Sequence, residues 1–105
     1  MYVRTNKGQI FDCIESEQMG KPIYYPKKSK TNGYIDYNEV YKKSNNIIDI
    51  CEVGDYVNGY KITDFEDDGK IILGNEEQLY GIYENQIKTI VTREQFSQME
   101  YKVKE

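Results

Sequence analysis

The chain has 105 residues, 30% of them charged, with 14 Lys or Arg, 18 Asp or Glu and a formal net charge of −4. This length fits one ordinary domain, and 24 Ile, Val, Leu and Phe residues supply enough apolar side chain for a core despite a mean hydropathy of −0.81. The chain has no histidine, which excludes histidine-based nucleophile activation, histidine proton shuttles and most transition-metal sites.

The first predicted element is a β-hairpin at the N-terminus. Met1–Thr5 and Gln9–Glu15 are its two strands, and Gly8 supplies the positive φ that the turn requires. A second turn at Gln18–Lys21 leads into a short strand at Pro22–Tyr25, because proline is tolerated at the first position of a strand.

The segment that follows is less regular. A polar loop at Pro26–Gly33 ends in Asn32-Gly33, a strong turn signal. The next segment, Tyr34–Tyr41, fits either of two elements. Its tyrosines and aliphatic residues are typical of a strand, whereas Asp36 with Glu39 three residues later is typical of a capped helical turn.

Short strands separated by turns also fill the second half. Asn58-Gly59 and Asp67-Asp68-Gly69 are expected to close two hairpins. Thr92 and Gln95 have the spacing of a capping box, so a helix of one or two turns is expected through Met99. The expected strands are Ile47–Cys51, Tyr60–Phe65, Lys70–Leu73, Gln78–Tyr83, Ile87–Val91 and an edge strand at Tyr101–Val103, with a turn at Glu84–Gln86.

This pattern predicts a mainly β fold with an N-terminal β-hairpin and one short C-terminal helix. Short strands with turn signals about every eight to twelve residues are typical of a small barrel or sandwich of antiparallel strands. Val53-Gly54-Asp55 followed by a bent hairpin resembles the entry of SH3-like barrels, over about residues 47–92. No repeat or linker divides the sequence, so we expect a single domain spanning residues 1–105.

Charge is distributed unevenly along the chain. Residues 1–45 carry eight Lys or Arg and five Asp or Glu, whereas residues 46–105 carry six and thirteen. A net acidic protein is poorly suited to grip phosphates, so Lys27, Lys28 and Lys30 are interpreted first as part of a solvated loop. The acidic half is either an ordinary solvated surface or a face that meets a basic partner.

The candidate functional residues are carboxylates and tyrosines. The simplest interpretation of the carboxylates is that they form a turn, and the functional interpretation is that they contact a partner. A metal-dependent hydrolase would also need ligands that converge from different elements and a general acid or base. Tyrosine is enriched at interfaces, where it serves as a neutral anchor, and is also common in strands. The candidate partner-binding residues are Asp64, Glu66, Asp67, Asp68, Glu76, Glu77, Tyr60 and Tyr80.

The sequence contains no catalytic or cofactor motif. The glycine and lysine at Gly59 and Lys61 do not form a phosphate-binding loop, and the serines have no histidine partner. Cys13 and Cys51 are lone cysteines that we expect to be reduced and partly buried, with a disulfide as the alternative. We therefore expect no enzymatic activity, no cofactor and no metal.

Two segments of the sequence resemble a known group of proteins. Asn46–Ile62 is similar to small phage and prophage proteins of low-GC Gram-positive bacteria, and Ile87–Phe96 resembles their closing segment. Some proteins of this size and type are anti-CRISPR inhibitors of type II-A RNA-guided Cas nucleases. The resemblance implies a phage-encoded protein that binds and inhibits such a nuclease without catalysis, in the cytoplasm of the bacterial host cell.

This expectation is compatible with the charge, because a Cas nuclease holds its guide and target in positively charged channels.

One alternative is a phage structural or assembly protein that forms oligomers through strand edges. No run of ~18 apolar residues and no signal-peptide stretch is present, so a cytoplasmic protein without a membrane partner is expected. A third hypothesis is a small nucleic-acid-binding barrel that uses Lys27, Lys28, Lys30, Lys42 and Lys43.

Overall fold

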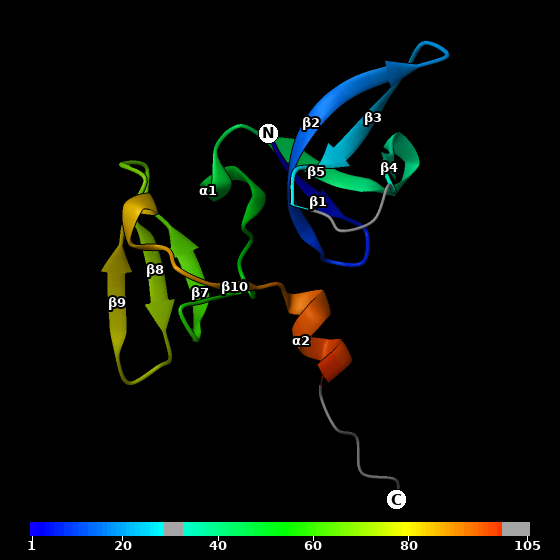
Figure 1. Ribbon diagram of the computed structural model, residues 1–105. Coiled ribbons are helices and arrows are strands. Elements are labelled where there is room, and N and C mark those ends of the chain that lie inside the picture. The colour runs from blue at the N-terminus through cyan, green and yellow to red at the C-terminus, as the bar shows by residue number, and fades with distance from the viewer. Residues whose placement is uncertain (29–32, 100–105) are drawn as a thin grey trace, which may run out of the picture. The chain divides into compact units, whose positions relative to one another are not determined.

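The computed structural model describes residues 1–28 and 33–99 (Figure 1). The described residues are mainly β, as the sequence predicts, and form two five-stranded antiparallel sheets. The chain divides into two compact units, Met1–Ile50 and a second unit that begins at Cys51, and each contains one sheet. The expectation of one domain with an SH3-like core over residues 47–92 stays a prediction. No helix in the described part of the chain is long and apolar enough to span a bilayer.

The first unit contains the predicted N-terminal hairpin. Val3 lies opposite Phe11 in the paired strands, and Gly8 in the connecting turn has a φ of 85°, which only glycine adopts easily. A second hairpin follows directly, which confirms the predicted strand at residues 22–25. In spatial order the strands are β4 (Ile35–Asp36), β3 (Lys21–Pro26), β2 (Ile10–Gln18), β1 (Tyr2–Thr5) and β5 (Val40–Ser44).

A small core holds this sheet together. Val3, Cys13, Tyr24 and Ile35 are buried in one cluster, with partly buried residues such as Phe11 packed against it. These side chains come from four different strands, so their burial fixes the register of the sheet. Each fully buried side chain of this kind contributes roughly 1.5–3 kcal/mol to folding.

The segment at Ile47–Ile50 is a correction to the sequence prediction, because it forms the short helix α1 rather than a strand. The polar residues before it explain the difference. Asn46 Oδ1 accepts the Ile48 N–H at 3.2 Å, and Ser44 Oγ donates to Asp49 Oδ2 at 2.8 Å, so side chains satisfy groups of the first turn. The buried Arg4 Nη1 donates to the Ile50 carbonyl at 3.0 Å and ties the end of α1 to β1.

The ambiguous segment before α1 contains both predicted elements. Ile35–Asp36 is strand β4, and Tyr37–Glu39 is a single 3₁₀ turn, η1, that leads into β5. Asp36 occupies the position before this turn, as the sequence suggested, although its side chain makes no capping hydrogen bond. The predicted Asn32-Gly33 turn falls partly on residues 29–32, outside the described residues.

The second unit is a meander with a C-terminal helix. Asn58 and Gly59 have φ values of 53° and 87°, which confirms a tight turn before the central strand. The predicted strand at Ile87–Val91 is shorter than expected, and Tyr101–Val103 lies outside the described residues. In spatial order the strands are β10 (Ile90–Val91), β6 (Tyr56–Val57), β7 (Tyr60–Phe65), β8 (Ile71–Gly74) and β9 (Leu79–Ile82), with the 3₁₀ turn η2 (Glu84–Gln86) and helix α2 (Arg93–Met99).

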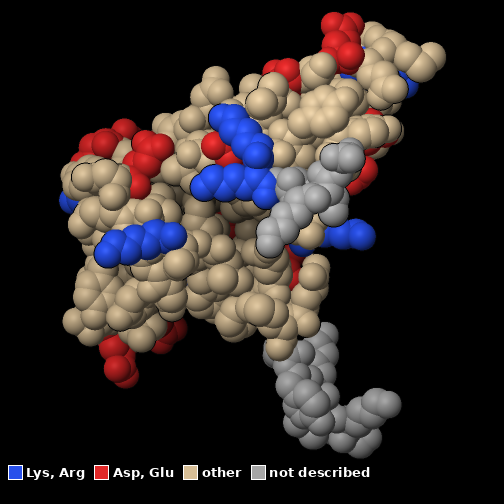
Figure 2. Space-filling view, in the orientation of Figure 1, with Lys and Arg blue, Asp and Glu red and all other residues tan. Residues whose placement is uncertain are grey.

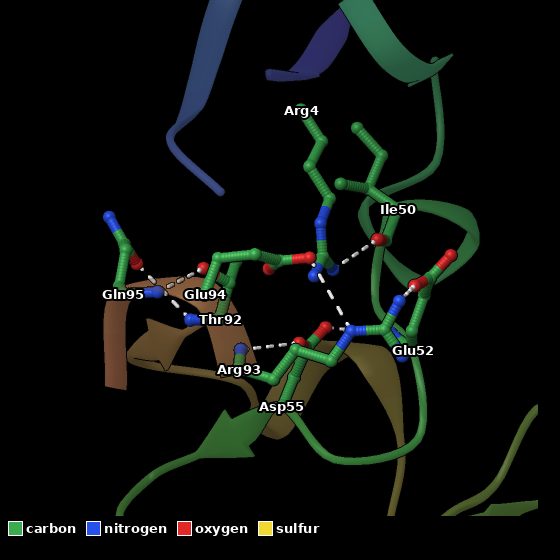
Figure 3. A network of polar contacts seen from close by, with 8 residues as sticks. All are labelled: Arg4, Ile50, Glu52, Asp55, Thr92, Arg93, Glu94 and Gln95. Atoms are coloured by element: carbon green, nitrogen blue, oxygen red, sulfur yellow. Dashed lines mark hydrogen bonds and ion pairs between the residues drawn. The ribbon is translucent and has the colours of Figure 1, made fainter. Parts of the chain in front are cut away.

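The predicted capping box at the start of α2 is confirmed. Thr92 N–H donates to Gln95 Oε1 at 3.1 Å, and Gln95 N–H donates to Thr92 Oγ1 at 3.2 Å (Figure 3). The fully buried Asp55 adds a second anchor, because its carboxylate accepts the N–H groups of Glu52 at 2.7 Å and Arg93 at 2.9 Å. An ion pair of 2.7 Å between Arg93 and Glu52 closes this network around the helix start.

Candidate functional site

Four of the six carboxylates singled out in the sequence lie in or beside the β7–β8 hairpin turn. We call Glu66, Asp67 and Asp68 the acidic turn. Asp68 Oδ1 accepts the Lys70 N–H at 3.0 Å and its Oδ2 accepts the Tyr83 hydroxyl at 3.1 Å, so this residue shapes the turn. Lys70 Nζ lies 3.9 Å from Glu66 Oε2, while Asp67 is exposed to solvent.

These contacts change the acidity of one carboxyl group. The backbone N–H of Lys70 holds the pKa of Asp68 below its usual range, and the Tyr83 hydroxyl and the Lys70 charge act in the same direction. Asp68 therefore stays ionised to a lower pH than an ordinary aspartate does. The acidic turn retains negative charge at neutral pH, with Lys70 offsetting one of its three carboxylates.

Beside the acidic turn, the outer part of the sheet forms an open hollow with charged and apolar walls. Asp64 and Glu66 line it together with Ile72 and Leu79, and Leu79 is 60% exposed. The methylene stem of Lys70 lies over Gly81, because a Cβ added there would be 2.6 Å from Lys70 Cδ. The hollow thus offers carboxylates next to exposed apolar surface, a combination suited to a basic, partly apolar ligand.

The second pair of predicted carboxylates lies at the opposite end of the same strands. Glu76 and Glu77 are in the β8–β9 turn, which Asn75 organises by accepting the N–H groups of Glu77 at 2.9 Å and Gln78 at 3.0 Å. Figure 2 shows carboxylates gathered over the β7–β8 turn at the upper left and a separate group at the lower left. The structure therefore places the predicted acidic residues in two groups at the two ends of one sheet.

The predicted tyrosine anchors meet each other but face away from Asp64. The rings of Tyr60 and Tyr80 are 5.3 Å apart and about half exposed. Tyr80 is opposite Leu73 and Leu73 is opposite Ile62, so these three side chains share one face. A β-bulge between Ile62 and Asp64 turns Asp64 to the other face, where it pairs with Ile72.

Sequence reasoning missed an exposed aromatic surface on the first unit. Ile14 and Tyr25 are cross-strand partners that are 58% and 41% exposed, and the Tyr25 ring lies 6.1 Å from that of Tyr34. Met19, at the tip of the β2–β3 hairpin, is 96% exposed. The sequence contained one signal of this surface, which was the abundance of tyrosine in residues 24–41.

The described residues contain no group of three His, Cys, Asp or Glu side chains arranged to hold a metal ion. Cys13 and Cys51 are free thiols and both are buried. Burial raises the pKa of the Cys13 thiol, with a further contribution from Asp12, so it is a weak nucleophile at neutral pH.

Comparison with known protein families, curated proteins and solved structures finds no match for this chain. The candidate functional site therefore rests on the residues and the geometry of this structure. The acidic turn, the hollow beside it and the Glu76-Glu77 turn belong to one sheet, and all lie in the more acidic unit, which carries six Lys or Arg and twelve Asp or Glu. This sheet is the candidate functional site.

Proposed function

We propose that this chain is a phage-encoded anti-CRISPR protein that binds a type II-A RNA-guided Cas nuclease and inhibits it without catalysis. The observation that carries the proposal is the exposed acidic turn with Asp64 beside it, four carboxylates within five residues of which Lys70 offsets one. Such a nuclease holds nucleic acid in basic channels, and a compact acidic surface competes with phosphates for the same lysines and arginines.

The arrangement of the charges supports binding rather than chemistry. Glu66 and Asp67 lie on a hairpin turn whose shape is supported by two hydrogen bonds of Asp68, which reduces the conformational freedom that the turn loses on binding a partner. A net charge of −6 on the second unit also accelerates encounter with a basic protein, an effect that salt weakens.

The direct test mixes the purified protein with a type II-A Cas nuclease, with and without guide RNA, and measures co-elution and DNA cleavage. We expect a stable complex with lost cleavage, and dependence on guide RNA reports which assembly state is bound. Absence of a complex with several nucleases of this type would contradict the proposal.

Charge reversal tests the contact surface. Glu66→Lys with Asp67→Lys leaves the turn-forming Asp68 intact and should weaken inhibition at least about tenfold, because two attractions become repulsions. Glu17→Lys with Glu39→Lys is the matched control, since these exposed carboxylates belong to the first unit. Equal loss of inhibition in both double variants would show that only total charge matters and would remove the acidic turn as the contact.

The two other hypotheses receive less support. For direct nucleic-acid binding, Lys27 and Lys43 are already paired with Asp12 at 3.3 Å and Glu15 at 3.1 Å, which reduces their positive potential. For assembly through strand edges, the carboxylates at both ends of β9 oppose the pairing of this edge with its own copy.

A further inference from the structure

We infer that the outer edge of β9 is a docking site for an extended segment of a partner protein, one with apolar residues in its centre and Lys or Arg at both ends. The inference rests on the proposed function in one respect, since it names the chemistry of the contact that would hold the nuclease. It goes further by assigning the contact to backbone pairing at one strand.

The edge of β9 is open to another strand. β9 is the last strand in the order β10-β6-β7-β8-β9, and no strand in the described part of the chain pairs with its second edge (Figure 1). The strand Leu79–Ile82 contains neither the lysine nor the proline with which proteins commonly block such an edge. Leu79, Tyr80 and Gly81 are all exposed, so an incoming segment meets apolar surface as well as backbone groups.

Carboxylates bracket this edge at both ends. At its start, Glu76 and Glu77 precede Leu79 in the β8–β9 turn. At its end, Ile82 pairs with Ile71 and the next residue, Tyr83, hydrogen-bonds to Asp68, which places the acidic turn beside the end of the strand. A segment added to β9 would therefore have each of its ends close to negative charge, and basic residues at both ends are complementary to that pattern.

Lys70 of the chain itself shows which contacts a lysine side chain makes at the acidic-turn end of β9. The stem of Lys70 packs over Gly81, and its ammonium lies near Glu66 and 5.8 Å from the centre of the Tyr83 ring. Methylene packing on a bare glycine, a carboxylate and an aromatic face are contacts that suit a lysine or arginine, and Lys70 itself makes them here. Asp67 in the acidic turn is exposed and can meet a cation of the partner.

The length of β9 sets the length of the ligand. Four residues of strand extend about 13 Å. A partner strand of four residues with basic residues directly before and after it reaches both acidic ends. The same charges discriminate against self-pairing, because two copies of β9 placed side by side would bring their carboxylate groups together.

A synthetic peptide tests the docking site without a nuclease. The probe is the blocked peptide KRVTVTKR, added to the isotopically labelled full chain and followed by NMR. We expect shifts at the amides of residues 79–82 and slowed hydrogen exchange at those whose N–H groups face the open edge. The analogue EEVTVTEE should not bind, and methylation of two adjacent central amide nitrogens of KRVTVTKR should weaken binding at least about tenfold, because it removes a hydrogen bond from either edge of the peptide.

Charge variants of the chain provide the matched comparison. We expect the binding of KRVTVTKR to weaken at least about fivefold in two double variants, Glu76→Lys with Glu77→Lys at one end and Glu66→Lys with Asp67→Lys at the other. The control variant Glu17→Lys with Glu39→Lys should bind the peptide as the unchanged chain does. Equal binding of the methylated peptide, or no binding of KRVTVTKR, would overturn the inference. A chain that inhibits a nuclease yet ignores the peptide would keep the proposed function and lose this docking site, and the reverse result would keep the docking site alone.

Discussion

Asp55 shows how one buried carboxylate connects distant parts of the second unit. It accepts N–H groups from Glu52 and from Arg93, which is 38 residues away. Asp55→Ala leaves both donors without this partner, so we expect a loss of about 2–4 kcal/mol in the free energy of unfolding, measured by urea denaturation. Asp67→Ala is the control and should change stability by less than about 0.5 kcal/mol, because Asp67 is exposed. Similar values for both variants would contradict this role.

Met19 is a residue at which backbone conformation and side-chain type disagree. Its φ is 53°, a left-handed conformation that costs a non-glycine residue free energy and that asparagine tolerates best. Met19→Asn should therefore raise stability by roughly 0.5–1 kcal/mol in thermal or urea unfolding. A decrease would mean that the exposed methionine makes stabilising contacts.

The hydrogen bond between Tyr83 and Asp68 gives the acidic turn a pH dependence. Because the folded-state pKa of Asp68 is lowered, its ionised form favours folding, and this contribution is present at neutral pH and lost as pH falls through that pKa, below about pH 4. Tyr83→Phe removes a donor, so the Asp68 pKa should rise and acid unfolding should begin at higher pH. NMR titration of the carboxyl carbon measures the shift. Tyr60→Phe is the control, and an equal shift there would contradict the assignment.

At the scale of elements, turns and caps were predicted best. The hairpin turns at Asn58-Gly59 and Gly69 and the capping box of Thr92 and Gln95 were predicted correctly because each depends on residues within about four positions of one another. The segment Ile47–Ile50 was predicted wrongly as a strand. Its apolar run fits strand and helix equally, and the polar groups of Ser44 and Asn46 decided between them.

Residues 46–62 and 87–96, which are far apart in the sequence, meet in one structural network. Glu52 and Asp55 come from the first segment, and Thr92 and Arg93 come from the second (Figure 3). Gly54, which lies in the turn between Glu52 and Asp55, has a φ of 98°. Its N–H donates to the Ile62 carbonyl at 3.0 Å, so the glycine helps to hold the turn that positions Asp55. Both segments therefore supply residues that maintain the fold, while the candidate binding residues at the acidic turn lie outside both segments.

At the scale of the whole molecule, the uneven charge follows the division into two units. The first unit carries eight Lys or Arg and six Asp or Glu, against six and twelve in the second. The carboxylates at both ends of β9 oppose pairing between copies. We therefore expect a monomer of about 12.4 kDa by light scattering at low salt. A stable ring or higher oligomer would favour the assembly hypothesis over a one-to-one inhibitor.

The sequence by itself determined the β class, the hairpin turns, the capping box and the acidic character of the β7–β8 turn, because these depend on neighbours along the chain. Only the tertiary structure decided which residues share a face. Strict alternation would put Tyr60, Ile62 and Asp64 together, yet the bulge between Ile62 and Asp64 moves Asp64 to the opposite side. Register across β7, β8 and β9 likewise brought two acidic turns to the ends of one open strand, and such pairing depends on contacts between residues far apart in sequence.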